Sequence, residues 1–171
     1  HSKGTLMGYQ LIETIEVGSG GAASIEFTGI PQDGVHLILK TSLRANYAGY
    51  QGKIGINNAS GTYTSRYLLS SNSSVSSNDA NKTLGWGYPI MNQSDFTANT
   101  FSSNTLTIPN YTGSNLKLAS LEGVSENNGS NNQMIMFAGV APDSSAVTSI
   151  QVISGGDFVQ YSSASLYMIT A

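Results

Sequence analysis

The chain has 171 residues, of which 39% are hydrophobic and 10% charged, and its formal net charge is -3. This balance of moderate hydrophobicity and low net charge excludes a disordered chain, and the length predicts one domain with its own core. There is no cysteine, which excludes disulfides and thiolate metal sites. Seven Lys and Arg residues, spread without runs, leave no basic stripe for nucleic acid.

The first six residues, His1–Leu6, read HSKGTL and precede Met7. We interpret residues 1–6 as a tag or linker remnant and residues 7–171 as a single β-sandwich domain. No apolar run approaches the roughly 18–20 residues of a membrane-spanning helix, and the N-terminus lacks the pattern of a signal peptide. We therefore expect a soluble protein with no membrane insertion.

Residues that interrupt regular structure are frequent along the whole chain. Ser, Asn, Thr and Gly together make up 74 of 171 residues, and the longest stretch free of Gly, Pro, Ser and Asn is Tyr9–Val17. Long helices are excluded, because they need about 10–12 uninterrupted residues of 3.6-residue periodicity. Period-two alternation of apolar and polar residues instead predicts strands at residues 23–28 and 35–44. Further strands are expected at 11–17, 53–57, 62–69, 83–88, 104–109, 115–124, 133–140, 148–154 and 158–170, the last with a break at 162–163.

Short strands separated by regular turn sequences indicate an all-β fold. We predict an antiparallel β-sandwich, jelly-roll-like, with about ten strands. Ser70–Asn81 is rich in Ser and Asn and is expected to form an exposed loop. Met134–Phe137 lacks alternation, which predicts that its strand is covered on both faces, either by the second sheet and a loop or by a neighbouring subunit.

The residues available for catalysis or metal binding are few. Apart from His1, the only imidazole is His36, on the polar face of a predicted strand, and no G-x-S-x-G motif surrounds any serine. The acidic residues occur singly, on outward strand positions or in turns, without the spacing of a calcium loop. We expect no enzyme activity, no catalytic residues, no metal and no cofactor.

Aromatic residues in predicted loops are the candidate ligand-binding residues. Trp86 and Tyr88 lie in the sequence GWGYP, and Tyr47 and Tyr50 lie in NYAGY. Exposed rings with amide and hydroxyl neighbours can stack on the C–H face of a sugar while the polar groups bond its hydroxyls. The alternative is that these rings close one end of the sandwich as part of the core.

Four separated segments carry a resemblance to a known family: residues 9–31, 108–115, 125–128 and 158–167. Together they resemble a family of small virion proteins of tailed bacteriophages, abundant in aquatic phages, over essentially residues 9–171. The resemblance implies a tail-fibre or receptor-binding component, or a capsid decoration protein, located at the virion surface after synthesis in the bacterial cytoplasm. It carries no family motif that assigns individual residues.

The leading hypothesis is a non-enzymatic virion surface protein that binds host-surface glycans through Tyr47, Tyr50, Trp86 and Tyr88. Expected partners are other copies of the chain, as a homotrimer, other virion proteins and glycans. The alternative is a decoration protein that stabilises the phage head through a large buried interface. A third class, a polysaccharide hydrolase, predicts two convergent carboxylates in a cleft.

Overall fold

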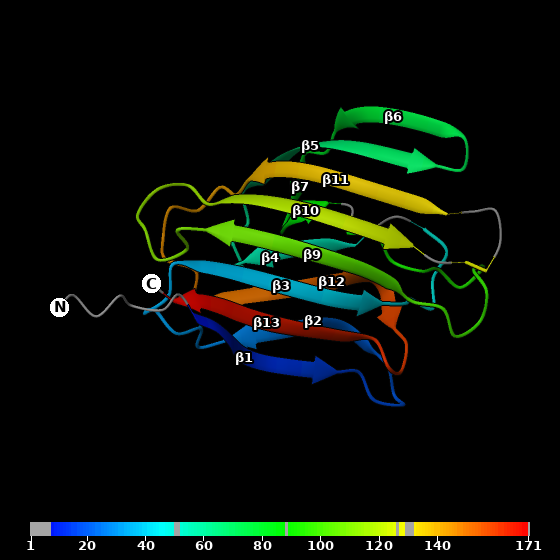
Figure 1. Cartoon of the computed structure of the whole chain (residues 1–171), viewed down its shortest axis with the longest axis horizontal. Helices are drawn as coiled ribbons and strands as arrows, with labels where there is room; N and C mark the ends of the chain where they lie inside the picture. Colours follow the sequence, from blue (N-terminus) through cyan, green and yellow to red (C-terminus); the bar gives the residue numbers. More distant parts are fainter. Residues whose placement is uncertain (1–7, 50–51, 88, 126, 129–131, 171) are drawn as a thin grey trace.

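The chain forms two antiparallel sheets packed face to face (Figure 1). The computed structural model describes residues 8–49, 52–87, 89–125, 127–128 and 132–170. These residues contain no helix, and so none that is long and apolar enough to cross a membrane. The predicted all-β antiparallel sandwich is confirmed, with thirteen strands rather than about ten.

The larger sheet has nine strands, in the order β1-β13-β3-β9-β10-β11-β5-β6, with β7 also paired to β5. The smaller sheet has the order β2-β12-β4-β8. In chain order the strands are β1 (Gly8–Glu16), β2 (Ala22–Thr28), β3 (His36–Leu43), β4 (Lys53–Ile56), β5 (Thr62–Ser71), β6 (Ser74–Asp79), β7 (Lys82–Thr83), β8 (Trp86–Gly87), β9 (Ser102–Pro109), β10 (Leu118–Ser125), β11 (Gln133–Val140), β12 (Ser149–Phe158) and β13 (Ser163–Thr170).

The core lies between the two sheets and follows from the alternation in the sequence. In β3, the side chains of Leu37, Leu39, Thr41 and Leu43 are buried, whereas the alternate positions are half-buried or exposed. The smaller sheet contributes cross-strand sets from three adjacent strands, among them Phe27, Ile150 and Ile56. Full burial of one such side chain stabilises the fold by about 1.5–3 kcal/mol, so the alternation largely decides which face of each strand is inward.

The prediction of a loop at Ser70–Asn81 is wrong, because this segment contains β6, which pairs with β5 in antiparallel register. The two strands are joined by a short turn in which Asn72 has a φ of 54°. All six β6 residues are exposed, so the strand has no buried face to produce an alternation pattern. Pairing with β5, rather than burial of one face, makes this segment a strand.

Loops at one end of the sandwich are held together by a buried cation. Lys117 is 2% exposed, and its Nζ donates hydrogen bonds to the carbonyl oxygens of Gly113 and Asn115 at 2.6 Å and of Ser144 at 3.0 Å. The lysine thereby ties the β9–β10 connection to the β11–β12 connection. Burial lowers the pKa of Lys117, and the nearby Asp143 carboxylate opposes that shift.

Asp143 links the same end to the loop after β4. Its Oδ2 accepts a hydrogen bond from Asn57 Nδ2 at 2.8 Å, and its Oδ1 accepts one from Ser145 N at 2.8 Å. Burial raises the pKa of the Asp143 carboxyl, but these hydrogen bonds and the Lys117 ammonium together outweigh it, so the pKa is lowered.

This lowered pKa predicts a loss of stability in acid that depends on Asp143. A carboxyl whose pKa is lower in the folded state than in the unfolded chain stabilises the protein at pH values above its ordinary pKa of 3.8. This contribution is lost as the pH falls through the pKa of the folded state. Urea denaturation of Asp143→Asn across the acid range should therefore give a flatter dependence of unfolding free energy on pH. Asp95→Asn is the control. An unchanged slope in Asp143→Asn would contradict the assignment.

Candidate functional site

Of the four aromatic residues expected to bind ligand, Tyr47 is at the surface, in the loop after β3. Its side chain is 38% exposed, and its backbone oxygen accepts a hydrogen bond from Ser94 N. The ring lies against Gly49 and Gly156, where a Cβ would come within 3 Å of the tyrosine side chain. Tyr50 and Tyr88 lie outside the described residues.

Trp86 lies in the core, so the expectation of a surface ring that stacks on a sugar is not met. It is 0% exposed and packs edge-on against Tyr63, with ring centroids 5.2 Å apart and an interplanar angle of 81°. The glycine before it permits this position: a Cβ on Gly85 would lie 2.7 Å from the Ile54 backbone. Close approach of β8 to β4 therefore explains the glycine next to the tryptophan better than ligand access does.

A groove of about 850 Å³ lies elsewhere, on the outer face of the larger sheet. It crosses β9, β10, β11, β5 and β6, which are consecutive neighbours in that sheet (Figure 1). On the outward positions of these strands, its lining includes hydroxyls, charged groups of both signs and two large apolar side chains: Ser77, Thr105, Thr107 and Ser120; Arg66, Asp79 and Glu122; and Leu68 and Met136.

Strand register arranges these side chains in two rows across the groove. The first, which we call the central row, joins Thr105, Glu122, Met136, Leu68 and Ser77 through successive cross-strand pairs. Directly opposite residues on neighbouring strands have Cβ atoms about 4.5–5.5 Å apart, so neighbouring members of a row are close enough to contact one ligand together.

The second row, which we call the charged row, joins Thr107, Ser120, Ala138, Arg66 and Asp79 in the same way. It lies two residues along each strand from the central row, on the same face of the sheet. Together the two rows give the groove a floor with both apolar and hydrogen-bonding groups.

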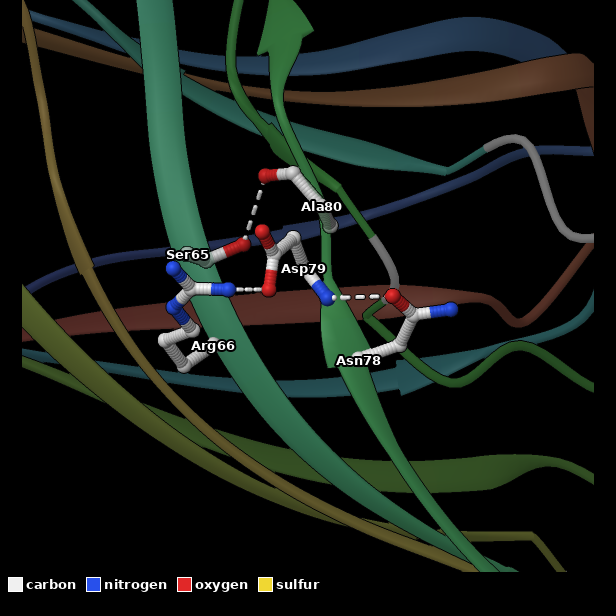
Figure 2. A network of polar contacts seen from close by, with 5 residues as sticks. All are labelled: Ser65, Arg66, Asn78, Asp79 and Ala80. Carbon is white, nitrogen blue, oxygen red and sulfur yellow. Dashed lines mark hydrogen bonds and ion pairs between the residues drawn. The ribbon is translucent and has the colours of Figure 1, made fainter.

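At the β5–β6 rim, Arg66 and Asp79 form an ion pair across the two strands (Figure 2). Asp79 N also donates a hydrogen bond to Asn78 Oδ1 at 2.8 Å, and Ser65 Oγ donates one to the Ala80 oxygen at 2.9 Å. The Arg66 and Asp79 side chains are exposed, so the pair adds at most about 1 kcal/mol to stability. Its main consequence is that the Arg66 charge is already compensated within the groove.

A strip of exposed apolar side chains, which we call the apolar strip, lies beside the groove on the outer face of the larger sheet. It consists of Val124, Met134 and Val75, which are 47%, 59% and 76% exposed. The first two are directly paired, and Val75 is opposite Ser70, which is paired with Met134. Exposed apolar side chains grouped in this way, with Ser70 between Met134 and Val75, are typical of protein interaction surfaces.

The burial of the side chains in residues 134–137 tests the prediction that this segment is covered on both faces. Ile135 and Phe137 are buried, whereas Met134 and Met136 are exposed, so no part of the described chain forms the predicted loop cover. That alternative is wrong, and cover by a neighbouring subunit stays a prediction.

The imidazole of His36 lies on β3, where its Nδ1 accepts a hydrogen bond from Asn110 N at 3.3 Å. The groove lining includes three charged residues, Arg66, Asp79 and Glu122, and His36 is not part of it. Within the described ranges, no three His, Asp or Glu residues gather in a way that could hold a metal ion.

The groove was not predicted from the sequence. The outward positions of residues 104–109 and 118–124 could be read from alternation, which places Thr105, Thr107, Ser120 and Glu122 on one face of their strands. The sequence of a single segment does not show which strands are neighbours or in which register they pair.

Comparison of the chain with models of protein families, with curated proteins and with solved structures gave no match in any of the three. The resemblance to virion proteins of tailed bacteriophages therefore stays a prediction.

Proposed function

We propose that the protein is a non-enzymatic bacteriophage virion surface protein that binds host-surface glycans in the groove of its larger sheet. The observation that supports this proposal is the composition of the groove floor, where hydroxyl and carboxylate groups lie beside two apolar side chains. A sugar chain has the same mixed character, with hydroxyls that need hydrogen-bond partners and C–H faces that favour apolar contact. The groove replaces the four aromatic residues as the proposed binding site.

The binding would be multivalent. Contacts through exposed hydroxyls and one carboxylate give modest affinity per subunit, because each hydrogen bond replaces one with water. Several copies on one particle, such as the expected homotrimer, raise the effective concentration and hence the avidity by about 10²–10⁴ without new contacts. A virion surface location supplies such repeated copies.

Ser120→Trp tests this function by filling the groove. Ser120 is exposed on β10, between Thr107 and Ala138, so an indole there occupies the floor without entering the core. We expect at least a tenfold loss of binding to host lipopolysaccharide or capsule fractions, about 1.4 kcal/mol per tenfold. Surface plasmon resonance with the immobilised polysaccharide measures it.

Leu11→Trp is the matched control for this experiment. Leu11 is half exposed on β1, at the opposite edge of the same sheet, so the same residue is introduced outside the groove. This variant should bind like the unaltered protein. Equal binding by Ser120→Trp, or no binding of any host polysaccharide by the unaltered protein, would contradict the proposed function.

The apolar strip favours a second candidate, a decoration protein that clamps neighbouring capsid subunits. Val124, Met134 and Val75 offer contact area to a protein rather than hydrogen bonds to a sugar. Electron microscopy of virions labelled with an antibody to the chain separates the candidates. Label on the head lattice supports decoration, and label at the tail supports glycan attachment.

A further inference from the structure

The central row places a carboxylate beside two exposed apolar side chains. Glu122 on β10 is directly opposite Met136 on β11, and Met136 is directly opposite Leu68 on β5. Met136 is 61% and Leu68 55% exposed, so both present their side chains to a ligand in the groove. Neighbouring strands lie about 4.8 Å apart, so the three side chains span about 10 Å of the floor.

The Glu122 carboxylate is available to a ligand. Among the residues that the structure describes, the ion pair within the groove joins Arg66 to Asp79 and leaves Glu122 out. Arg66 and Asp79 cancel, so the groove lining carries the one net negative charge of Glu122. An ionised carboxylate accepts hydrogen bonds and donates none, so it favours a ligand that presents an N–H or O–H donor and disfavours an acidic sugar.

A single substituent can satisfy both parts of this arrangement. In a planar trans amide, the N–H lies opposite the carbonyl oxygen, and the acyl methyl group is therefore on the same side as the N–H. An acetamido group thus offers a donor and a methyl group along one edge, which matches a carboxylate flanked by apolar side chains. The hydroxyl of a plain hexose at the same position would leave Met136 and Leu68 without an apolar partner.

We infer that Glu122, Met136 and Leu68 form a subsite for the acetamido group of an N-acetylated amino sugar. The inference rests on the proposed function and specifies its ligand class. In the complex, Glu122 accepts a hydrogen bond from the amide N–H, and the methyl group packs on Met136 and Leu68. The hydroxyls of Thr105 and Ser77, at the two ends of the central row, then face the hydroxyls of the adjoining sugar units.

Two oligosaccharides that differ only in this substituent test the subsite. The β-1,4 tetramer of N-acetylglucosamine and the β-1,4 tetramer of glucose share the same backbone and differ at carbon 2. Isothermal titration calorimetry of the unaltered protein should give about tenfold tighter binding of the N-acetylated tetramer, the expected value of one hydrogen bond to a charged group. Equal or reversed affinities would overturn the inference.

Two variants show whether the preference comes from this row. Glu122→Ala removes the acceptor and Met136→Ala removes the apolar contact, and each should reduce the preference to about twofold or less. Both positions are exposed on the sheet face, so neither change opens a cavity in the core. Leu11→Ala, on the same face at the far edge, should keep the full preference.

Failure of the subsite differs from failure of the function. If host polysaccharide binds and Ser120→Trp abolishes that binding, but neither tetramer is preferred, the groove binds glycans and the acetamido subsite is overturned. If no saccharide binds at all, both are overturned. A preference that survives in Glu122→Ala and Met136→Ala also overturns the subsite, because the selecting residues then lie elsewhere.

Discussion

Replacement of Lys117 by methionine is expected to destabilise the protein by about 3 kcal/mol, since hydrogen bonds to a charged group contribute about 1.5–3 kcal/mol each. Methionine keeps most of the side-chain volume but leaves the carbonyl oxygens of Gly113, Asn115 and Ser144 without this donor. The substitution also removes the desolvation penalty of the buried ammonium. The expected loss of unfolding free energy is therefore well below the sum of three hydrogen bonds.

Equilibrium unfolding in urea measures this effect, and Lys40→Met is the matched control. Lys40 is exposed on β3, so the same substitution there should change the unfolding free energy by less than about 0.5 kcal/mol. Similar losses in the two variants would show that the Lys117 hydrogen bonds do not hold the two connections together.

Trp86→Ala is expected to cost about 4 kcal/mol, near the middle of the range for large aromatic truncations in cores. The ring is fully buried, contacts Tyr63 edge-on and lies under Gly139, where a Cβ would meet the indole Cδ1 at 2.6 Å. Because the Gly139 backbone lies against the ring, collapse into the cavity from that side is restricted. A domain with a total stability of about 5–15 kcal/mol becomes marginal after such a loss.

Trp86→Phe separates the packing of the ring from its polar atom. Nε1 of Trp86 has no hydrogen-bond partner among the described residues, so phenylalanine removes volume without breaking a hydrogen bond. We expect a loss of about 1–2 kcal/mol. Circular dichroism during urea denaturation follows both variants, since each removes the only tryptophan. Equal losses in the two variants would contradict the packing argument.

The elements with a buried face were predictable from the sequence. β3 and β11 were expected within one or two residues of their observed bounds, because hydrophobic burial on one face produces alternation or an apolar run. β6 was not predictable, since its six exposed residues carry no such pattern and its pairing with β5 depends on backbone hydrogen bonds.

The candidate site was less predictable than the fold. Glu122 and Thr105 were recognisable as outward positions, but their place beside Leu68 depends on the strand order β9-β10-β11-β5, which a single sequence does not specify. For Trp86, the prediction placed a core residue at the surface. A tryptophan between two glycines can equally be a loop residue open to ligand or a core residue where two strands approach closely, and residue type alone does not separate the two.

The position of β13 between β1 and β3 in the larger sheet has a consequence for biosynthesis. β1 is made before β13, yet along its described length it pairs only with β13, through contacts such as Gly8 with Thr170, more than 150 residues apart. During translation, the nascent β1 must wait without its partner until residues 163–170 emerge from the ribosome. Loop closure over this separation slows the pairing of β1 with β13, and chaperones would meet the protein in a state with this edge still open.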